Sequence, residues 1–135
     1  MQQLNKSELD ALHEALDDEY RAWATYDQVI SDFGEVRPFI NIRDAEARHI
    51  QALRSLFNAY GIIVPRNTWP GQVTRYSSLH EACAAGVAAE IDNDKMYKRL
   101  FQSTDRSDIL TVFHNLQEAS QQRHLPAFQR CVERN

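Results

Sequence analysis

Proline and glycine are scarce in this sequence, with four residues of each among 135. Because both residues interrupt helices and mark turns, their scarcity favours long helices and argues against an all-β fold with many turns. No segment approaches the ~18–20 consecutive apolar residues that a membrane-spanning helix needs. The first residues also lack the apolar segment of a signal peptide. We therefore expect a cytoplasmic protein that has no membrane partner.

The sequence also lacks an excess of basic residues. Its formal net charge at pH 7 is −4, and no basic stripe runs along it. Nucleic-acid binding is therefore not expected. The length suffices for one hydrophobic core and is too short for two ordinary ones, so we predict that residues 1–135 form one domain.

Cysteine is equally rare, and the two that occur, Cys83 and Cys131, are far apart in the sequence. They form no Cys-x-x-Cys motif for zinc or for a rubredoxin-like iron site. The simplest interpretation is two small buried residues. If their helices are antiparallel neighbours, both cysteines should lie at the same end of the bundle. A Cα separation beyond ~7 Å would then exclude a direct disulfide.

In four segments, apolar residues recur at alternating steps of three and four, the spacing of one face of a helix packed among other helices. The predicted helices run from near Ser7 to Gly34, from about Val36 to Tyr60, from Ser77 or Ser78 to Phe101, and from Asp105 or Ser107 to about Val132. We therefore predict an all-α fold, an antiparallel four-helix bundle. The broken but apolar stretch 61–75 should cross over between the second and third helices, along the outside of the bundle.

Three local signals add detail to these helices. Ser7 and the residues after it form a candidate capping box at the first helix. Gly86 lies on the inward stripe of the third helix, which favours close approach of a neighbouring helix. Pro126 lies inside the fourth helix, so we predict a bend within a turn of His124.

The inward stripes contain polar residues that an apolar core does not explain. Glu46 and His49 lie three residues apart on the second helix, within Glu46-Ala47-Arg48-His49. An unpaired buried carboxylate would cost several kcal/mol, so Glu46 needs a partner. Glu19 and Glu90 occupy core positions of the first and third helices, and His124 occupies one of the fourth. The residues could pair with each other, or they could share metal ions.

The two halves of the sequence have the same spacing of these residues. Tyr26 follows Glu19 by seven positions, and Tyr97 follows Glu90 by seven, so each tyrosine lies two turns along the face of its glutamate. The second and fourth helices correspond as well, since Glu46-x-x-His49 has its counterpart in Gln121-x-x-His124. This repetition indicates a diverged duplication. Tyr26 and Tyr97 could be core aromatics with a bonded hydroxyl, or they could donate hydrogen bonds to Glu90 and Glu19 across the site.

These motifs resemble those of the ferritin-like superfamily, in particular the rubrerythrin-like proteins and an uncharacterised ferritin-like family known only as a domain of unknown function. The similar segments are Glu19-Tyr20-Arg21-Ala22-Trp23-Ala24-Thr25-Tyr26, Glu46-Ala47-Arg48-His49, Asp94-Lys95-Met96-Tyr97 and His124-Leu125-Pro126-Ala127-Phe128. One carboxylate from each of two helices and Glu-x-x-His from the other two is the ligand set of the di-iron and di-manganese bundles.

The resemblance implies a metal site between the helices. Glu19, Glu46 and His49 would hold one ion, Glu90 and His124 would hold part of a second, and Glu46 would bridge the two. Iron is the expected metal, with manganese and zinc as alternatives, because all three accept carboxylate and imidazole ligands. The implied chemistry is peroxide reduction or ferroxidase activity.

The sequence departs from the family pattern at Gln121, where a second bridging carboxylate is expected. Asp94, one turn after Glu90, could replace it, and so could Glu118, although Glu118 faces partly away. Otherwise Gln121 is a weak ligand or an outer hydrogen-bonding partner, and the site holds one ion or none.

Two functions remain open from the sequence. The first is a ferritin-like metalloprotein that reacts with dioxygen or peroxide or handles iron, and that takes electrons from a separate donor protein. The second is a metal-free or zinc-stabilised helical binding or dimerisation module, in which the di-iron site has degenerated at Gln121. In either case we expect a homodimer, by analogy with other bundles.

Overall fold

Five α-helices make up most of residues 3–135, the part of the chain that the computed structural model describes, and this part contains no β-strand. They are α1 (Lys6–Phe33), α2 (Phe39–Ala59), α3 (Leu79–Leu100), α4 (Ser107–Ala119) and α5 (Leu125–Arg134). A 3₁₀ turn, Phe101–Ser103, follows α3, and a π-helical segment, Ser120–His124, joins α4 to α5. The predicted all-helical class is confirmed. Within this described part, no helix is long and apolar enough to cross a membrane.

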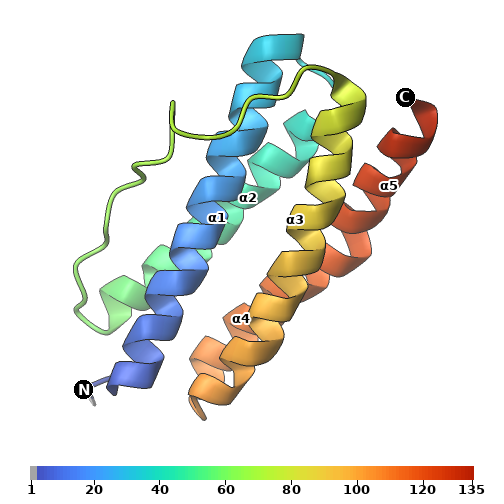
Figure 1. Cartoon of the computed structure of the whole chain (residues 1–135). Coiled ribbons are helices and arrows are strands. Elements are labelled where there is room, and N and C mark those ends of the chain that lie inside the picture. The colour runs from blue at the N-terminus through green and yellow to red at the C-terminus, as the bar shows by residue number, and fades with distance from the viewer. Residues whose placement is uncertain (1–2) are drawn as a thin grey trace.

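The helices pack as a bundle in which α1 lies along α2, and α3 lies along α4 and α5 (Figure 1). Its buried apolar side chains form two clusters. One cluster contains Leu12, Leu53 and Phe113, and the other contains Phe39 and Phe128. On α1, on α2, on α3 and along the consecutive helices α4 and α5, the polar residues of the inward stripe fall between these two clusters. The bundle therefore has a polar layer enclosed by apolar packing on either side.

The helix starts partly agree with the predicted capping. At α3, the Ser78 side chain accepts a hydrogen bond from the backbone N–H of Glu81, as expected for an N-cap. At α1, the prediction of a capping box at Ser7 is wrong. Asn5 is the N-cap, and it exchanges hydrogen bonds with Glu8. An asparagine amide caps as well as a serine hydroxyl does, so the N-cap lies two residues earlier than predicted.

The segment 60–78 contains no helix or strand and runs along the outside of α1 (Figure 1). Ile62, Val64 and Trp69 pack against the core, as predicted from their apolar character. Polar contacts attach the same segment to α1, because the Tyr20 hydroxyl donates to the carbonyl of Pro65 over 2.6 Å and the Trp69 indole donates to Asp17. This connection is therefore an ordered part of the fold.

The contact between α3 and α5 is especially close at Gly86. A Cβ atom at this position would lie 2.7 Å from the ring of Phe128, so a larger residue would force the helices apart. Cys83 and Cys131, one turn away on the same helices, form a disulfide with a Cα separation of 5.9 Å. Their predicted burial at one end of the bundle is confirmed. The interpretation as two separate core residues is wrong, because α3 and α5 approach closely enough to join them.

The predicted irregularity near Pro126 takes the form of the π-helical segment Ser120–His124. Proline cannot donate a backbone hydrogen bond, and its ring crowds the carbonyl of the residue four positions earlier, Gln122. A π-helical turn replaces the i→i+4 bonds with i→i+5 bonds and so accommodates this crowding. The helix therefore continues past Pro126 with an altered register of side chains.

Candidate metal centre

Five acidic and imidazole side chains meet in the polar layer of the bundle. They are Glu19 of α1, Glu46 and His49 of α2, Glu90 of α3 and His124 of the π-helical segment. All five are buried, with exposures of 9% for His49 and 2–3% for the others. They form two triads that share one residue, Glu19–Glu46–His49 and Glu46–Glu90–His124, and in each triad the ligand atoms lie within 4.8 Å of one another. The structure thus brings together the five residues singled out in the sequence, with Glu46 between them.

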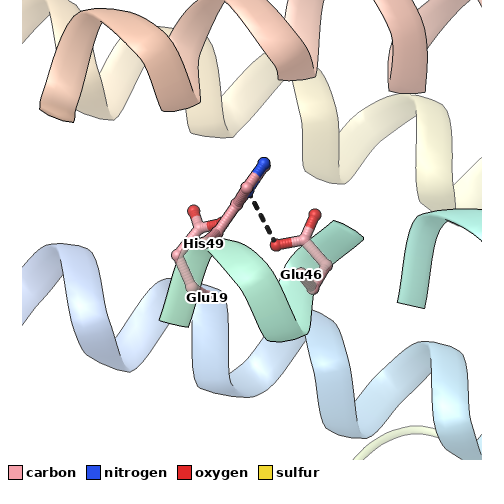
Figure 2. Close-up of side chains that lie close together, drawn as sticks. All are labelled: Glu19, Glu46 and His49. Atoms are coloured by element: carbon pink, nitrogen blue, oxygen red, sulfur yellow. Dashed lines mark hydrogen bonds and ion pairs between the residues drawn. The ribbon is translucent and has the colours of Figure 1, made fainter. Parts of the chain in front are cut away.

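In the first triad, the three side chains turn toward one another from α1 and α2 (Figure 2). The Nδ1 atom of His49 lies 2.9 Å from Oε1 of Glu19 and 3.5 Å from Oε2 of Glu46. The α-helical step of three residues places Glu46 and His49 on one face of α2. Glu19 reaches them because α1 packs along α2.

In the second triad, Nδ1 of His124 lies 3.2 Å from Oε1 of Glu46 and 3.4 Å from Oε1 of Glu90. The imidazole rings of His49 and His124 lie nearly parallel, with centroids 5.4 Å apart. The Glu46 carboxylate therefore faces a histidine on either side. One of its oxygens is directed to each triad.

Two buried tyrosines hold the outer carboxylates of the triads. The Tyr26 hydroxyl donates to Oε2 of Glu90 over 2.7 Å, and the Tyr97 hydroxyl donates to Oε2 of Glu19 over 3.0 Å. Of the two interpretations of these tyrosines, the structure shows the one in which they donate hydrogen bonds across the site. Burial, together with the nearby carboxylates, raises the pKa of both tyrosines well above the usual value. Both hydroxyls consequently remain protonated donors, and each leaves Oε1 of its glutamate free to face a histidine.

Sequence reasoning missed two polar residues beside the first triad, Asn93 and Asp18. The Asn93 amide donates to Oε2 of Glu19 over 3.0 Å and to Asp18 over 2.9 Å. Asp18 is half-buried, and burial and the charge of Glu19 raise its pKa to about 6. The available signal was the position of Asn93, which follows Glu90 by three residues on the inward face of α3.

Gln121 and Asp94 are not arranged as ligands. The Gln121 amide donates to the backbone carbonyl of Glu90 over 2.9 Å and to Ser120. Asp94 accepts a hydrogen bond from Gln117 and forms an ion pair with Lys98. The expectation that Asp94 replaces the missing carboxylate is therefore wrong, because its oxygens are already paired at the edge of the site.

Glu118, the other candidate replacement, is exposed on α4. Its exposure follows from the regular face of α4, on which Phe113 and Leu116 are buried. The π-helical segment that follows has a wider turn, which changes which residues share a face. Ser120 and His124 are buried there, whereas Gln121 is only partly buried. The step from Gln121 to His124 is thus not equivalent to the α-helical step from Glu46 to His49.

The ionisation of the triads reflects their burial and proximity. Burial, followed by the charge of Glu46, raises the pKa of Glu19 to about 7. Burial by itself would lower the pKa of His49, but contacts with Glu19 and Glu46 raise it to about 10. For His124, contacts with Glu46 and Glu90 likewise outweigh burial and raise the pKa to about 9. For Glu46, burial by itself would raise the pKa, but contacts with Glu19, His124 and His49 lower it overall. Protons on the histidines thus balance the carboxylates.

The positions of the side-chain atoms fit a metal ion. Two ligand atoms bound at ~2.0–2.2 Å to one ion, roughly 90–110° apart, are separated by about 2.8–3.6 Å. The contacts within the two triads, from 2.9 to 3.5 Å, fall in this range. In addition, Oε2 of Glu46 and Nδ1 of His124 are buried and make no well-aligned hydrogen bond, although each lies within ion-pair distance of a neighbour, 3.5 Å from His49 and 3.2 Å from Glu46. Buried polar atoms are rarely left unpaired, and a bound ion would satisfy both. The cluster could therefore hold a metal ion.

Comparisons with known proteins extend only to the fold. No protein-family model matches this chain, and no curated protein matches it. The structure is similar to the crystal structure of a hypothetical protein from Methanococcus jannaschii, with a TM-score of 0.88 and 23% sequence identity. The match covers 99% of this chain and 84% of the other. At this identity the likeness concerns the helical fold, and the function is argued from the site itself.

Proposed function

We propose that this protein is a ferritin-like metalloprotein whose centre binds iron between the helices of an antiparallel bundle with one crossover. The observation that carries the proposal is the position of Glu46, which is shared by two buried triads of carboxylate and imidazole. Each triad contains one unsatisfied atom at ligand separation from its neighbours, Oε2 of Glu46 or Nδ1 of His124. A polar network without metal would be expected to pair these atoms.

In this proposal, Glu19, Glu46 and His49 hold one ion, and Glu46, Glu90 and His124 hold the other. Three carboxylates carry three negative charges, so they do not fully neutralise two divalent ions. Gln121 supplies no charge, and its amide is turned to a backbone carbonyl. The second ion should therefore bind more weakly than the first.

Iron bound in this way would supply redox chemistry toward dioxygen or peroxide. The residues of the chain contribute orientation and proton balance. Tyr26 and Tyr97 hold Oε2 of Glu90 and Glu19, which leaves the opposite oxygens for the ions. His49 and His124 must lose the protons that they hold in the metal-free state, because a protonated Nδ1 cannot bind a metal.

Carboxylate and imidazole ligands also suit manganese and zinc, so iron is assigned by the resemblance of the motifs. The proposal includes a separate electron-donor protein, because the chain has no cysteine motif for a rubredoxin-like iron site. It also includes a homodimer, as in other bundles of this architecture.

Anaerobic titration of metal-free protein with Fe(II), followed by elemental analysis, tests the proposal. We expect one tightly bound ion and a weaker second ion per chain. Exposure to dioxygen or peroxide should then oxidise the bound iron faster than free Fe(II) at the same concentration. Parallel titrations with Mn(II) and Zn(II) identify the preferred metal. A chain that retains no iron would contradict the proposal.

The replacement of a bridging carboxylate by Gln121 supports a second candidate function. Here the site is a metal-free or zinc-stabilised remnant within a helical binding or dimerisation module. A ligand that binds only the folded state must raise stability, so the melting temperature separates the two candidates. No change with Fe(II), Mn(II) or Zn(II) would favour the metal-free module, and a rise with Zn(II) alone would favour the zinc-stabilised form.

A further inference from the structure

A groove of about 450 Å³ opens between α2 and α5, on the side of the metal centre where the two histidine rings lie. Five arginines line it, and we call it the arginine groove. They are Arg37, Arg48, Arg123, Arg130 and Arg134. All five side chains are exposed at its rim. No aspartate or glutamate lines the groove, so its formal charge is strongly positive.

The arginines of this groove differ from others in the protein. Within residues 3–135, none of the five forms an ion pair with a carboxylate, whereas Arg43, Arg75 and Arg99 do. The chain as a whole has a net charge of −4. Five like charges around one concave surface of an acidic protein repel one another and concentrate positive potential there. An anion from solution would relieve this repulsion.

The arginines are distributed along the length of the groove. Arg48 and Arg123 are adjacent in sequence to His49 and His124, which also line the groove. Arg134 lies eleven residues after Arg123, or about 16 Å along a helix. The start of α2 and the end of α5 lie at the same end of the bundle, which places Arg37 near the end marked by Arg134 (Figure 1). Positive charge is thus present toward both ends.

Between these ends, the lining is small and apolar. It includes Ala45 on one side and Ala119 and Ala127 on the other, with Ile42 and Pro38 toward the start of α2. Alanine side chains leave room between the helices for a flat or compact body, and apolar groups favour burial of carbon-rich surface. The surface therefore combines charged rims with an apolar interior, and it does not suit a bare inorganic ion alone.

We propose that the arginine groove binds a phosphorylated organic molecule of about mononucleotide size. Guanidinium groups form paired hydrogen bonds with phosphate oxygens, which makes arginine better suited to this group than lysine. The volume lies within the range of about 300–1,000 Å³ typical of small-molecule sites. The body of the ligand would lie over the alanines, against the edges of the His49 and His124 rings. This site is additional to the proposed metal centre, and binding in it does not require a metal.

Calorimetric titration of the full chain tests this inference with a panel of probes. The organic phosphates are adenosine monophosphate, flavin mononucleotide and glucose 6-phosphate, and the controls are inorganic phosphate, adenosine and succinate. We expect at least one organic phosphate to bind at least tenfold more tightly than every control. Its affinity should fall as salt is raised, because salt screens exposed charges.

The variant Arg37→Gln/Arg130→Gln should lower the affinity for the organic phosphate by about tenfold or more. A hydrogen bond between charged groups contributes about that factor to an affinity. The matched control is Arg54→Gln/Arg66→Gln. These two arginines are exposed, lie outside the groove and form no ion pair within the described residues. The control variant therefore removes two positive charges, as the test variant does. It should bind the phosphate as the unmodified chain does.

Three results would overturn the inference. The first is millimolar or weaker binding of every organic phosphate, and the second is equal weakening by both double variants. The third is an arginine-dependent preference of the groove for a single-stranded RNA or for a second copy of the chain, detected by titration and light scattering. Iron content is measured in the same samples. In the unmodified chain, absence of phosphate binding with normal iron content would count against the groove alone, and absence of iron with normal phosphate binding would count against the metal centre alone.

Discussion

The two triads of the candidate metal centre share Glu46 but differ in how completely their other atoms are held. In the first, Glu19 accepts hydrogen bonds from Tyr97 and Asn93, and its second oxygen contacts His49 at 2.9 Å. In the second, the side chain of Glu90 accepts a hydrogen bond from Tyr26, and Nδ1 of His124 has no hydrogen-bond partner. Each triad has one buried atom without a hydrogen bond, but the first triad is held by more hydrogen bonds from its neighbours than the second.

This difference follows from the helices that carry the triads. The first triad is built on two regular α-helices, α1 and α2, and its motif keeps the α-helical step of three residues. The second uses His124 from a π-helical segment, in which Gln121 turns to a backbone carbonyl. Preorganised ligands bind more tightly because less ordering is needed on binding. We infer that the first triad fills first with metal.

Replacement of the shared carboxylate should have the largest effect. In Glu46→Gln, both triads lose a charged ligand, and metal affinity should fall by at least ~100-fold, since loss of an outer hydrogen-bonding partner alone costs roughly 10–100-fold. Elemental analysis after dialysis should find almost no iron. The control Glu118→Gln removes the same charge from an exposed position on α4 and should keep full metal content. Retention of one tight ion in Glu46→Gln would show that the triads are independent.

Replacement of one histidine at a time should separate the triads. His124→Asn should remove the weaker ion and leave the tight one, because the contacts of Glu19 with His49 remain. His49→Asn should remove the tight ion and leave weak binding. The measurement is iron stoichiometry as a function of free Fe(II) concentration. The opposite order of affinities would contradict the inference that the first triad is better organised.

The pH dependence of the centre follows from the two histidines. Their pKa values in the folded, metal-free protein, about 10 for His49 and about 9 for His124, lie above the unfolded value near ~6.5. Their contribution to stability is therefore fully present below about pH 6.5 and is lost as the pH rises through 9 to 10. Metal binding must release these protons, so affinity should rise with pH, by roughly tenfold per pH unit for each proton released.

Melting temperatures between pH 6.5 and 9.5 check both consequences. The melting temperature of metal-free protein should fall as the pH rises, because the histidines lose their charges. The rise in melting temperature produced by added metal should become larger over the same range. The variant His49→Asn/His124→Asn is the control for other titrating groups, and it should lack both trends. A metal affinity that does not change across this range would mean that neither histidine gives up a proton.

Restoration of the missing carboxylate should have the smallest effect. Gln121→Glu adds a negative charge beside the second triad and should strengthen the weaker ion by a few-fold. The gain is limited because a glutamate must first turn away from the carbonyl of Glu90, to which the amide now donates. Gln122→Glu adds the same charge at an exposed neighbouring position and should change nothing. Equal effects of both variants would indicate a general charge effect.

Much of the fold could be predicted because each helix shows an apolar stripe that is complete within its own sequence. The same regularity identified Glu19, Glu46, His49, Glu90 and His124, since polar residues at inward positions stand out against apolar neighbours. Capping was less predictable, as Asn5 and Ser7 are both suitable N-caps and two residues apart. Asp94 was misassigned because the sequence does not show that Gln117 and Lys98 lie within reach of its oxygens.

The sequence by itself determined that helices would meet at a buried layer of carboxylates and imidazoles, because helical periodicity is a local property of consecutive residues. Only the tertiary structure decided which of those groups face each other, that Cys83 reaches Cys131, and that His124 lies on a π-helical turn. It also decided that arginines from α2, the link before it, the π-helical segment and α5 line one groove. These features depend on distances between helices, and such a distance is set where a residue without a side chain, Gly86, lets the ring of Phe128 approach the neighbouring helix.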